Sequence, residues 1–264
     1  MSDIFENGID SLHIGIRYFL YGEFETAHKH SILNVFHSIE LFLKEKLSKV
    51  HPILIYKNID KPINNDSLTV GLNEIIIRFK NLGIKLNPKQ ESVLKELQRR
   101  RNIIEHHKFI PDDSHYYIIG KALKFIYYFL PEHLSCTLEE HLDEDIYTQV
   151  RKVILDYDER LSDAKMKVQE IIEKHKDVSS VDPIHTSTCP ECRNHTVVIE
   201  SDKGDFCFFC YEEIDITSED LKQCGCCLNY YLDDEMSGCG DCLECVDEQL
   251  SDEPYFQRKH IEKT

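Results

Sequence analysis

Hydrophobic residues recur at helical spacing through the first part of the chain. Between residues 9 and 50 they fall three or four positions apart, the spacing that places side chains on one face of an α-helix. The step Tyr21-Gly22 interrupts this pattern. The sequence therefore predicts two amphipathic helices joined near residues 21–22. The apolar positions are Ile16, Phe19, Leu20, Ile32, Val35, Phe36, Ile39, Leu43 and Leu47.

Prolines and polar clusters divide the following residues into further helices. Residues 51–68 contain two prolines and two adjacent asparagines, which is typical of a connection. Pro88 suits the first turn of a helix, and Pro111 and Pro131 indicate where helices end. Helical patterns cover residues 71–81, 88–107, 114–130 and about 138–175. With no strand pattern in this span, residues 1–178 are predicted to form an all-α bundle.

The pattern changes after residue 178. The stretch SSVDPIHTSTCPEC is rich in Ser, Thr and Pro, which marks a boundary. Short β-type runs, TVVIE and FCFFC, then alternate with cysteine pairs, and this twofold recurrence of pairs is the one candidate internal repeat. We expect a mostly α protein with a helical bundle at residues 1–178 and a small β-rich module at residues 179–264.

Ten of the eleven cysteines lie between Cys189 and Cys245, in close pairs. The first two pairs form C-x2-C, fourteen residues, C-x2-C, and two such turns can hold one tetrahedral Zn²⁺. The later group is interpreted as Cys224 and Cys227 with Cys239 and Cys242, with Cys226 and Cys245 as spare thiols that compete for the second site. The expected ligands are Cys189, Cys192, Cys207 and Cys210 for the first zinc and Cys224, Cys227, Cys239 and Cys242 for the second.

Sites with four thiolates leave no position for water or substrate, so the two zinc ions are expected to be structural. Both cysteine groups resemble zinc ribbons. Many zinc ribbons bind nucleic acid, but residues 179–264 carry 6 Lys and Arg against 20 Asp and Glu. Phosphate would be repelled by this charge, and a protein partner is the expected neighbour of the tail.

Residues 1–178 are nearly balanced, with 25 basic and 28 acidic residues, although the total formal charge is -17. Within them, residues 78–108 hold nine basic and three acidic residues, a local excess suited to a polyanion such as RNA. The chain shows no export signal at its N-terminus and no run of roughly 18 apolar residues. A cytoplasmic protein that does not enter a membrane is expected.

Residues 99–107, RRRNIIEHH, concentrate polar chemistry on one predicted helix. On a helical wheel with Arg101 at zero, Asn102 lies at about 100° and His106 at about 140°, beside an apolar stripe. A guanidinium that binds phosphate and an imidazole that exchanges protons are the minimum for RNA cleavage by its own 2′-OH. An ordinary ion pair between Arg101 and Glu105, with His106 on the surface, fits the same spacing. The apolar stripe is formed by Val93, Leu97 and Ile104.

The segment RNIIEH, residues 101–106, resembles the R-x4-6-H signature of the HEPN superfamily. The stretch AHKHSILNVFHSIELFLKEKL and the segment leading into the signature are also similar to that family, so the resemblance covers roughly residues 9–130. The registers Arg100 to His106 and Arg101 to His107 fit the loose pattern too. The register from Arg101 to His106 is preferred because it places an asparagine directly after the arginine.

The resemblance implies a helical domain that forms a homodimer with the motif at its interface. It also implies a metal-independent endoribonuclease of toxin or antiviral-defence type, with RNA bound at the helical domain. Carried over by position, Arg101 would hold the scissile phosphate, Asn102 would orient it, and His106 would act as acid or base. The zinc ribbons would then be a regulatory or sensing module. The alternative is a non-catalytic HEPN and zinc-ribbon protein that binds other proteins or nucleic acid.

Overall fold

The computed structural model describes residues 3–24, 26–64, 66–106, 114–178, 184–199, 205–214 and 221–246. The chain forms two compact units, Met1–Arg160 and Leu161–Thr264. They are called the helical unit and the cysteine unit below. The expected order, helices first and a β-rich part after them, is confirmed.

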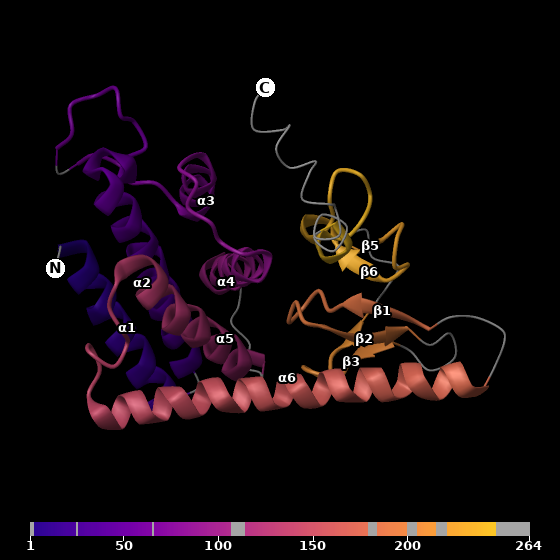
Figure 1. Ribbon diagram of the computed structural model, residues 1–264. Helices are drawn as coiled ribbons and strands as arrows, with labels where there is room; N and C mark the ends of the chain where they lie inside the picture. The colour runs from indigo at the N-terminus through magenta and orange to yellow at the C-terminus, as the bar shows by residue number, and fades with distance from the viewer. Residues whose placement is uncertain are drawn as a thin grey trace. The chain divides into compact units, whose positions relative to one another are not determined.

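The helical elements match most of the expected ranges (Figure 1). The predicted break near residues 21–22 separates α1 from α2. The last helix begins later than the expected residue 138, because Glu140 accepts hydrogen bonds from the backbone and hydroxyl of Thr137 and closes a turn there. The elements are α1 (Asp3–Tyr21), α2 (Ala27–Val50), η1 (Pro52–Ile55), α3 (Leu72–Asn81), α4 (Pro88–His106), α5 (Ser114–Phe129), η2 (Leu130–Leu134) and α6 (Glu144–Val178).

Helix α2 lies at the centre of the helical unit, alongside α1 and α5 (Figure 1). Its inward side chains, such as Ile39 and Leu43, are completely buried, and each contributes about 1.5–3 kcal/mol through removal from water. Helices α1 and α2 approach closely at Gly15. A Cβ at Gly15 would lie 2.7 Å from Cγ2 and 3.0 Å from the backbone nitrogen of Val35. Glycine at this position therefore permits the contact between the two helices.

Helix α4 carries the candidate RNA-binding motif and is fixed at several points. Asn87 accepts from the backbone N–H of Gln90 at 2.9 Å, and the Gln90 side chain accepts from the Asn87 N–H at 2.8 Å, which forms a capping box. The expected apolar stripe packs inward, with Leu97 and Ile104 each only 3% exposed. A buried ion pair of 2.7 Å joins Glu96 on α4 to Lys121 on α5. The motif helix therefore has a defined orientation in the bundle.

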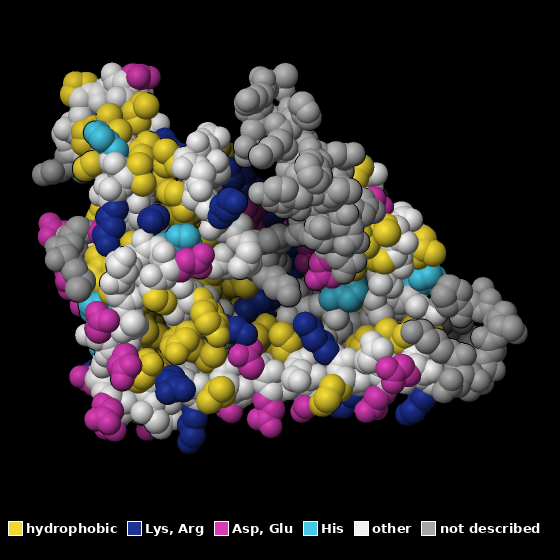
Figure 2. Space-filling view, in the orientation of Figure 1, with side chains coloured by type: hydrophobic (Ala, Val, Ile, Leu, Met, Phe, Trp, Pro, Cys, Tyr) yellow, Lys and Arg dark blue, Asp and Glu magenta, His cyan; other side chains and the backbone are white. Residues whose placement is uncertain are grey.

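The expected connection after α2 is a loop with ordered ends. The N–H of Lys57 donates to Leu68 O at 2.9 Å, and that of Val70 donates to Ile55 O at 2.9 Å. Between these ends the loop exposes apolar side chains, among them Leu68 at 74% and Ile63 at 41%. Hydrophobic side chains gather over this loop in the upper left of the space-filling view (Figure 2).

The described residues of the cysteine unit form one mixed sheet of six strands in the order β4-β3-β2-β1-β6-β5. All neighbouring pairs are antiparallel except β1 and β6, which are parallel and meet at Ser187 and Tyr230. That one pairing joins two hairpin-based halves into a single sheet. The strands are β1 (His185–Thr188), β2 (His195–Ile199), β3 (Asp205–Cys207), β4 (Glu213–Ile214), β5 (Leu221–Gln223) and β6 (Tyr230–Leu232).

The last part of α6 belongs to the cysteine unit. Ala164 and Val168 on this part are 1% and 7% exposed, and the charge of Lys165 acts on His195 in β2. The change in composition after residue 178 coincides with the end of α6, whereas the compact units divide at Arg160. None of the helices in the described part of the chain has the length and hydrophobicity needed to cross a membrane.

Candidate metal centres and the polar face of α4

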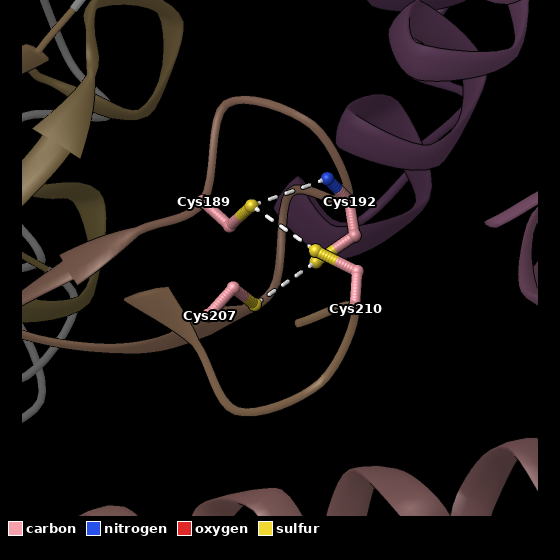
Figure 3. A group of neighbouring side chains, drawn as sticks. All are labelled: Cys189, Cys192, Cys207 and Cys210. Atoms are coloured by element: carbon pink, nitrogen blue, oxygen red, sulfur yellow. Dashed lines mark hydrogen bonds between the residues drawn. The ribbon is translucent and has the colours of Figure 1, made fainter. Parts of the chain in front are cut away.

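Four cysteines converge in the first half of the sheet (Figure 3). The turn after β1 supplies Cys189 and Cys192, and the turn after β3 supplies Cys207 and Cys210. The Sγ atoms of Cys189 and Cys210 are 3.6 Å apart, as are those of Cys192 and Cys207. All four sulfurs lie within 4.8 Å of one another. This is the set of cysteines that the sequence predicts for the first site.

The sulfur separations fit a tetrahedral metal ion. Four sulfurs at about 2.3 Å from a central Zn²⁺ are about 3.8 Å from one another, whereas a disulfide would require about 2.05 Å. No cysteine of the described residues is in a disulfide. A set of four soft thiolates with no oxygen or nitrogen ligand selects zinc over magnesium or calcium. The geometry and the donor chemistry both suit a structural zinc ion.

The first turn has a specific backbone conformation. The N–H of Arg193 donates to Cys189 O at 2.8 Å, and the N–H of Cys189 donates to Asn194 O at 3.0 Å. Arg193 closes this turn in the left-handed region, with φ of 54°. The tight turn directs the side chains of Cys189 and Cys192 to the same point.

A second cluster repeats this construction. The N–H of Leu228 donates to Cys224 O at 3.1 Å, the N–H of Cys224 donates to Asn229 O at 2.8 Å, and Leu228 has φ of 62°. The first turn has the same two backbone hydrogen bonds and the same left-handed residue at the equivalent positions. The sulfurs that come within 4.8 Å of one another are those of Cys224, Cys227, Cys242 and Cys245.

This cluster corrects one predicted ligand, because Cys245 occupies the position that the sequence analysis gave to Cys239. The side chain of Cys239 is exposed, and its sulfur lies 2.9 Å from Ser237 Oγ. Cys245 follows Cys242 on a short helical turn, and its N–H donates to Cys242 Sγ at 3.4 Å. The second site therefore also has the form C-x2-C, fourteen residues, C-x2-C.

With Cys245 in place, the two clusters form an internal repeat of 35 residues. Each ligand of the first cluster has its counterpart 35 positions later, as Cys189 has Cys224 and Cys210 has Cys245. The asparagine that accepts the first turn's hydrogen bond repeats as well, as Asn194 and Asn229. The constant offset is visible in the sequence, and it is the signal that would have identified Cys245.

Backbone N–H groups support the sulfurs of the second cluster. The N–H groups of Cys242 and Cys226 donate to Cys224 Sγ at 3.2 and 3.4 Å. Burial raises the pKa of Cys224, but the backbone hydrogen bonds from Cys227, Cys242 and Cys226 outweigh it and bring that pKa down to about 6. Burial raises the pKa values of Cys242 and Cys245, so among these three ligands only Cys224 is favoured as the thiolate, the form that binds a metal.

The candidate catalytic residues lie on one stretch of α4. The guanidinium of Arg101 pairs with Glu105 at 3.0 Å, and its Cζ lies 5.7 Å from the centre of the Phe36 ring. The Arg101 side chain is 37% exposed, while Asn102 and His106 are exposed. The ion pair that the sequence allowed is thus formed, and His106 is the last residue of α4. The contact with Phe36 was not foreseen.

The alternative registers of the motif involve Arg100 and His107. Arg100 is half-buried with its Nε enclosed, and Arg101, the residue before Asn102, is half-buried as well. His107 and Lys108 lie outside the described residues. Within the described part of the predicted basic stretch, the ammonium of Lys80 pairs with Glu91 at 3.0 Å and Arg78 donates to Leu54 O at 2.5 Å.

Comparison of the chain with protein-family models, with curated proteins and with solved structures finds no match. Function must therefore be inferred from the two cysteine clusters and from the polar face of α4.

Proposed function

We propose that the helical unit is a metal-independent endoribonuclease of the HEPN type and that the cysteine unit, stabilised by two zinc ions, regulates it. One observation carries the proposal. Asn102 and His106 lie one helical turn apart and exposed on α4, beside an arginine that is more than one third exposed. They occupy a helix whose opposite face is buried, so the three side chains are presented to solvent from a fixed support.

The chemistry follows from these side chains. As a base, His106 would take the proton of the ribose 2′-OH while the 2′ oxygen attacks the adjacent phosphorus. The bond to the 5′ oxygen breaks, leaving a 2′,3′-cyclic phosphate and a 5′-hydroxyl that receives a proton from an acid. Arg101 would stabilise the negative charge on the phosphoryl oxygens, and Asn102 would orient the phosphate. No metal ion is needed for this transfer.

A homodimer would supply the second acid or base. One chain contributes a single His106, whereas the reaction uses both a base and an acid. A twofold interface near α4 would place two copies of the motif opposite each other. The active species is therefore expected to sediment as a dimer, and activity in a species that remains monomeric at working concentration would contradict this part of the proposal.

The acidic cysteine unit is proposed to contact protein rather than RNA. Four thiolates around each Zn²⁺ leave both centres negative, and residues 179–264 add an excess of carboxylates. Both features repel phosphate. Such a unit can compete with RNA for the basic residues around α4 or receive a protein partner that controls activity.

A second candidate function is a non-catalytic interaction protein. The observation in its favour is the 3.0 Å pair between Arg101 and Glu105, which neutralises the guanidinium that the reaction requires. The exposed apolar loop around Ile63 and Leu68 suits a protein contact as well. Under this alternative the purified protein would leave RNA intact.

The decisive experiment is incubation of the purified full chain with RNA in the presence of EDTA. We expect cleavage that persists in the chelator, and a loss of about 10²–10⁴-fold in the His106→Ala variant, the usual contribution of a positioned acid or base. Arg101→Ala should lose activity to a similar degree because charge stabilisation in the transition state disappears.

The matched control is His175→Ala, because His175 is also an exposed histidine on a helix but lies on α6. It should retain full activity, and circular dichroism should show that all variants keep their helices. Unchanged cleavage in the His106→Ala or Arg101→Ala variant would exclude the proposed catalytic role.

A further inference from the structure

The sheet of the cysteine unit has two halves, and each half holds one cluster. The first half contains β1, β2, β3 and β4 with the first cluster, and the second half contains β5 and β6 with the second cluster. In the described strands, the pairing of Ser187 with Tyr230 joins the halves within the sheet. Isolated strand pairs are only marginally stable, so side-chain contacts across this boundary decide how firmly the halves hold each other.

The side chain of Tyr231 on β6 contacts both halves. Its ring stacks on that of His195 in β2, with 4.7 Å between the ring centres and 20° between the ring planes. Its hydroxyl oxygen lies 3.7 Å from Sγ of Cys227, a ligand of the second cluster, and the residue is only 7% exposed among the cysteines of that cluster. Groups that contact a metal ligand from outside orient it and tune its affinity for the metal. The position of His195 therefore affects the second site through Tyr231.

Strand β2 also contacts the first cluster. Thr196 directly follows His195 and occupies the position equivalent to Tyr231, 35 residues earlier. Its Oγ1 lies 3.1 Å from Sγ of the ligand Cys207, and Thr196 is completely buried. The segment of His195 and Thr196 thus contacts a ligand of the first cluster and also the aromatic ring that contacts a ligand of the second.

An ion pair forms a further connection between the two clusters. Arg193 closes the first metal-binding turn, and one of its guanidinium nitrogens lies 2.6 Å from each carboxylate oxygen of Asp234 in the second half. Asp234 belongs to the short turn η3 (Asp233–Glu235). This turn leads into Met236, which forms an antiparallel β-bridge with the ligand Cys242. The turn that would hold the first metal ion is therefore bonded to a segment that positions the second site.

We propose that the two centres bind zinc cooperatively, coupled through the stack of Tyr231 on His195 and through the ion pair of Arg193 with Asp234. The first zinc ion fixes one metal-binding turn and its strand, because a site of this kind is not formed without its metal. The contacts across the boundary then order the other half, so the second ion binds to ligands that are already in position.

This coupling is reciprocal, so either cluster raises the zinc affinity of the other by the same factor. Couplings of this kind change affinity by about 5–150-fold, and we expect about tenfold here. The cysteine unit would then hold two zinc ions or none over most of a narrow range of zinc concentration. The inference rests on the proposed zinc binding of both clusters and is independent of ribonuclease activity.

The test is a zinc titration of the metal-free, reduced full chain, in which native mass spectrometry counts the ions on each molecule. Two equal and independent sites would leave about half of the molecules with one zinc ion at half loading, and unequal sites would leave more. Tenfold coupling lowers that fraction to about one quarter. Two zinc ions at saturation test the proposed zinc binding separately. Half or more of the molecules with one ion at half loading would overturn the coupling.

Arg193→Gln breaks the ion pair between the halves and should raise the fraction with one zinc ion towards one half. Lys222→Gln is the matched control, because Lys222 pairs with Asp233 inside the second half. This control should leave the fraction unchanged. No change in the Arg193→Gln variant, or an equal increase in the control, would contradict the proposed connection.

Tyr231→Leu removes the ring that stacks on His195 and should also raise the fraction with one zinc ion. Tyr231→Phe keeps this ring, so it should retain most of the coupling and lose affinity mainly at the second site, where the hydroxyl contact with Cys227 is lost. Equal coupling in the two variants would exclude the stack as a connection. If Tyr231→Leu does not hold two zinc ions at saturation, the comparison of Tyr231→Phe with Arg193→Gln decides, and only Arg193→Gln should weaken the coupling strongly.

Discussion

The helical unit buries a continuous set of aliphatic and aromatic side chains, whereas the cysteine unit buries cysteines and hydroxyl groups beside a smaller set of apolar side chains such as Val197 and Phe209. In the first, α2 alone contributes Phe36, Ile39 and Leu43 to the core. In the second, the cluster of buried residues around Tyr231 consists otherwise of cysteines, and Ser187 and Thr196 are completely buried nearby. The two units therefore depend on different stabilising interactions.

This difference determines what can change in each unit. A hydrophobic core is insensitive to metal chelators and oxidants, so the helical unit is a stable support for the residues on α4. The cysteine unit has strands of only two to five residues, and the turns between them are fixed by the cysteines. A unit of this kind can lose its fold when metal is removed, which suits a sensing role.

Removal of zinc should give the largest effect and should separate the two units. Structural zinc contributes apparent free energies of about 10–16 kcal/mol to small domains, so its loss should unfold the cysteine unit. Hydrogen exchange should show lost protection in β1, β2 and β6 and retained protection in α1 and α2. Loss of protection in α1 and α2 as well would show that the helical unit depends on the metal.

The converse prediction concerns the core of the helical unit. Leu43→Ala removes a completely buried side chain and should lower the free energy of unfolding by about 2–5 kcal/mol. Denaturant unfolding measures this change, and the zinc content should stay the same. Leu68→Ala is the control because Leu68 is 74% exposed, and it should change stability little. Zinc loss in the Leu43→Ala variant would mean that the two units are not independent.

His195 makes the cysteine unit sensitive to acid. Its Nε2 lies 2.6 Å from Thr186 Oγ1, its Nδ1 lies 3.0 Å from Thr188 Oγ1, and its ring stacks on Tyr231. Burial, and to a smaller extent the charge of Lys165, lowers the pKa of His195 to about 4. The folded protein disfavours the charged imidazole of His195. The contribution of this residue to stability is therefore fully present above about pH 6.5, its pKa in the unfolded chain, and is lost as the pH falls towards 4.

Between the two pKa values of His195, the free energy of unfolding is expected to fall by on the order of 3 kcal/mol. Protonation of the zinc-binding thiolates also destabilises the unit in acid, so the measurement is the difference in slope between the protein and its His195→Gln variant. Unfolding of the cysteine unit is followed by hydrogen exchange at several pH values between 7 and 4.5. Parallel slopes for both proteins would exclude a contribution from His195.

Most helices could be predicted from the sequence, because apolar spacing and proline positions are local signals. The start of α4 at Pro88 is an example, since the capping box of Asn87 and Gln90 lies within four residues. The start of α6 was set too early because acidic residues favour a helix start over a broad range, and the turn at Thr137 and Glu140 decided its position.

The parts that the sequence did not reveal depend on contacts between distant residues. The parallel pairing of Ser187 with Tyr230 is specified by no local pattern, so the resemblance of each cysteine group to a zinc ribbon could not show that both share one sheet. The choice of Cys245 over Cys239 was missed because six cysteines at close spacing allow several sets of four. The contact between Arg101 and Phe36 joins two helices, and the spacing within α4 could not show it.

The smallest effect is expected at the surface of α4, where an exposed ion pair can be exchanged for a ligand at little cost. The carboxylate of Glu105 pairs with the guanidinium of Arg101 at 3.0 Å. An exposed ion pair of this kind on a helix contributes only about 0.3–0.5 kcal/mol to stability. Glu105→Gln should therefore leave stability unchanged and raise the affinity for single-stranded RNA by about twofold to fivefold, because the carboxylate no longer competes with phosphate.

Fluorescence anisotropy of a labelled RNA at low salt measures this affinity, and the increase should shrink as salt is added. Glu91→Gln is the matched control, because it removes the same charge from the same helix but from a carboxylate that pairs with Lys80. An equal gain in both variants would indicate a general charge effect, and the competition between Glu105 and phosphate for Arg101 would be excluded. A gain confined to Glu105→Gln would show that a weak surface pair controls access to the arginine.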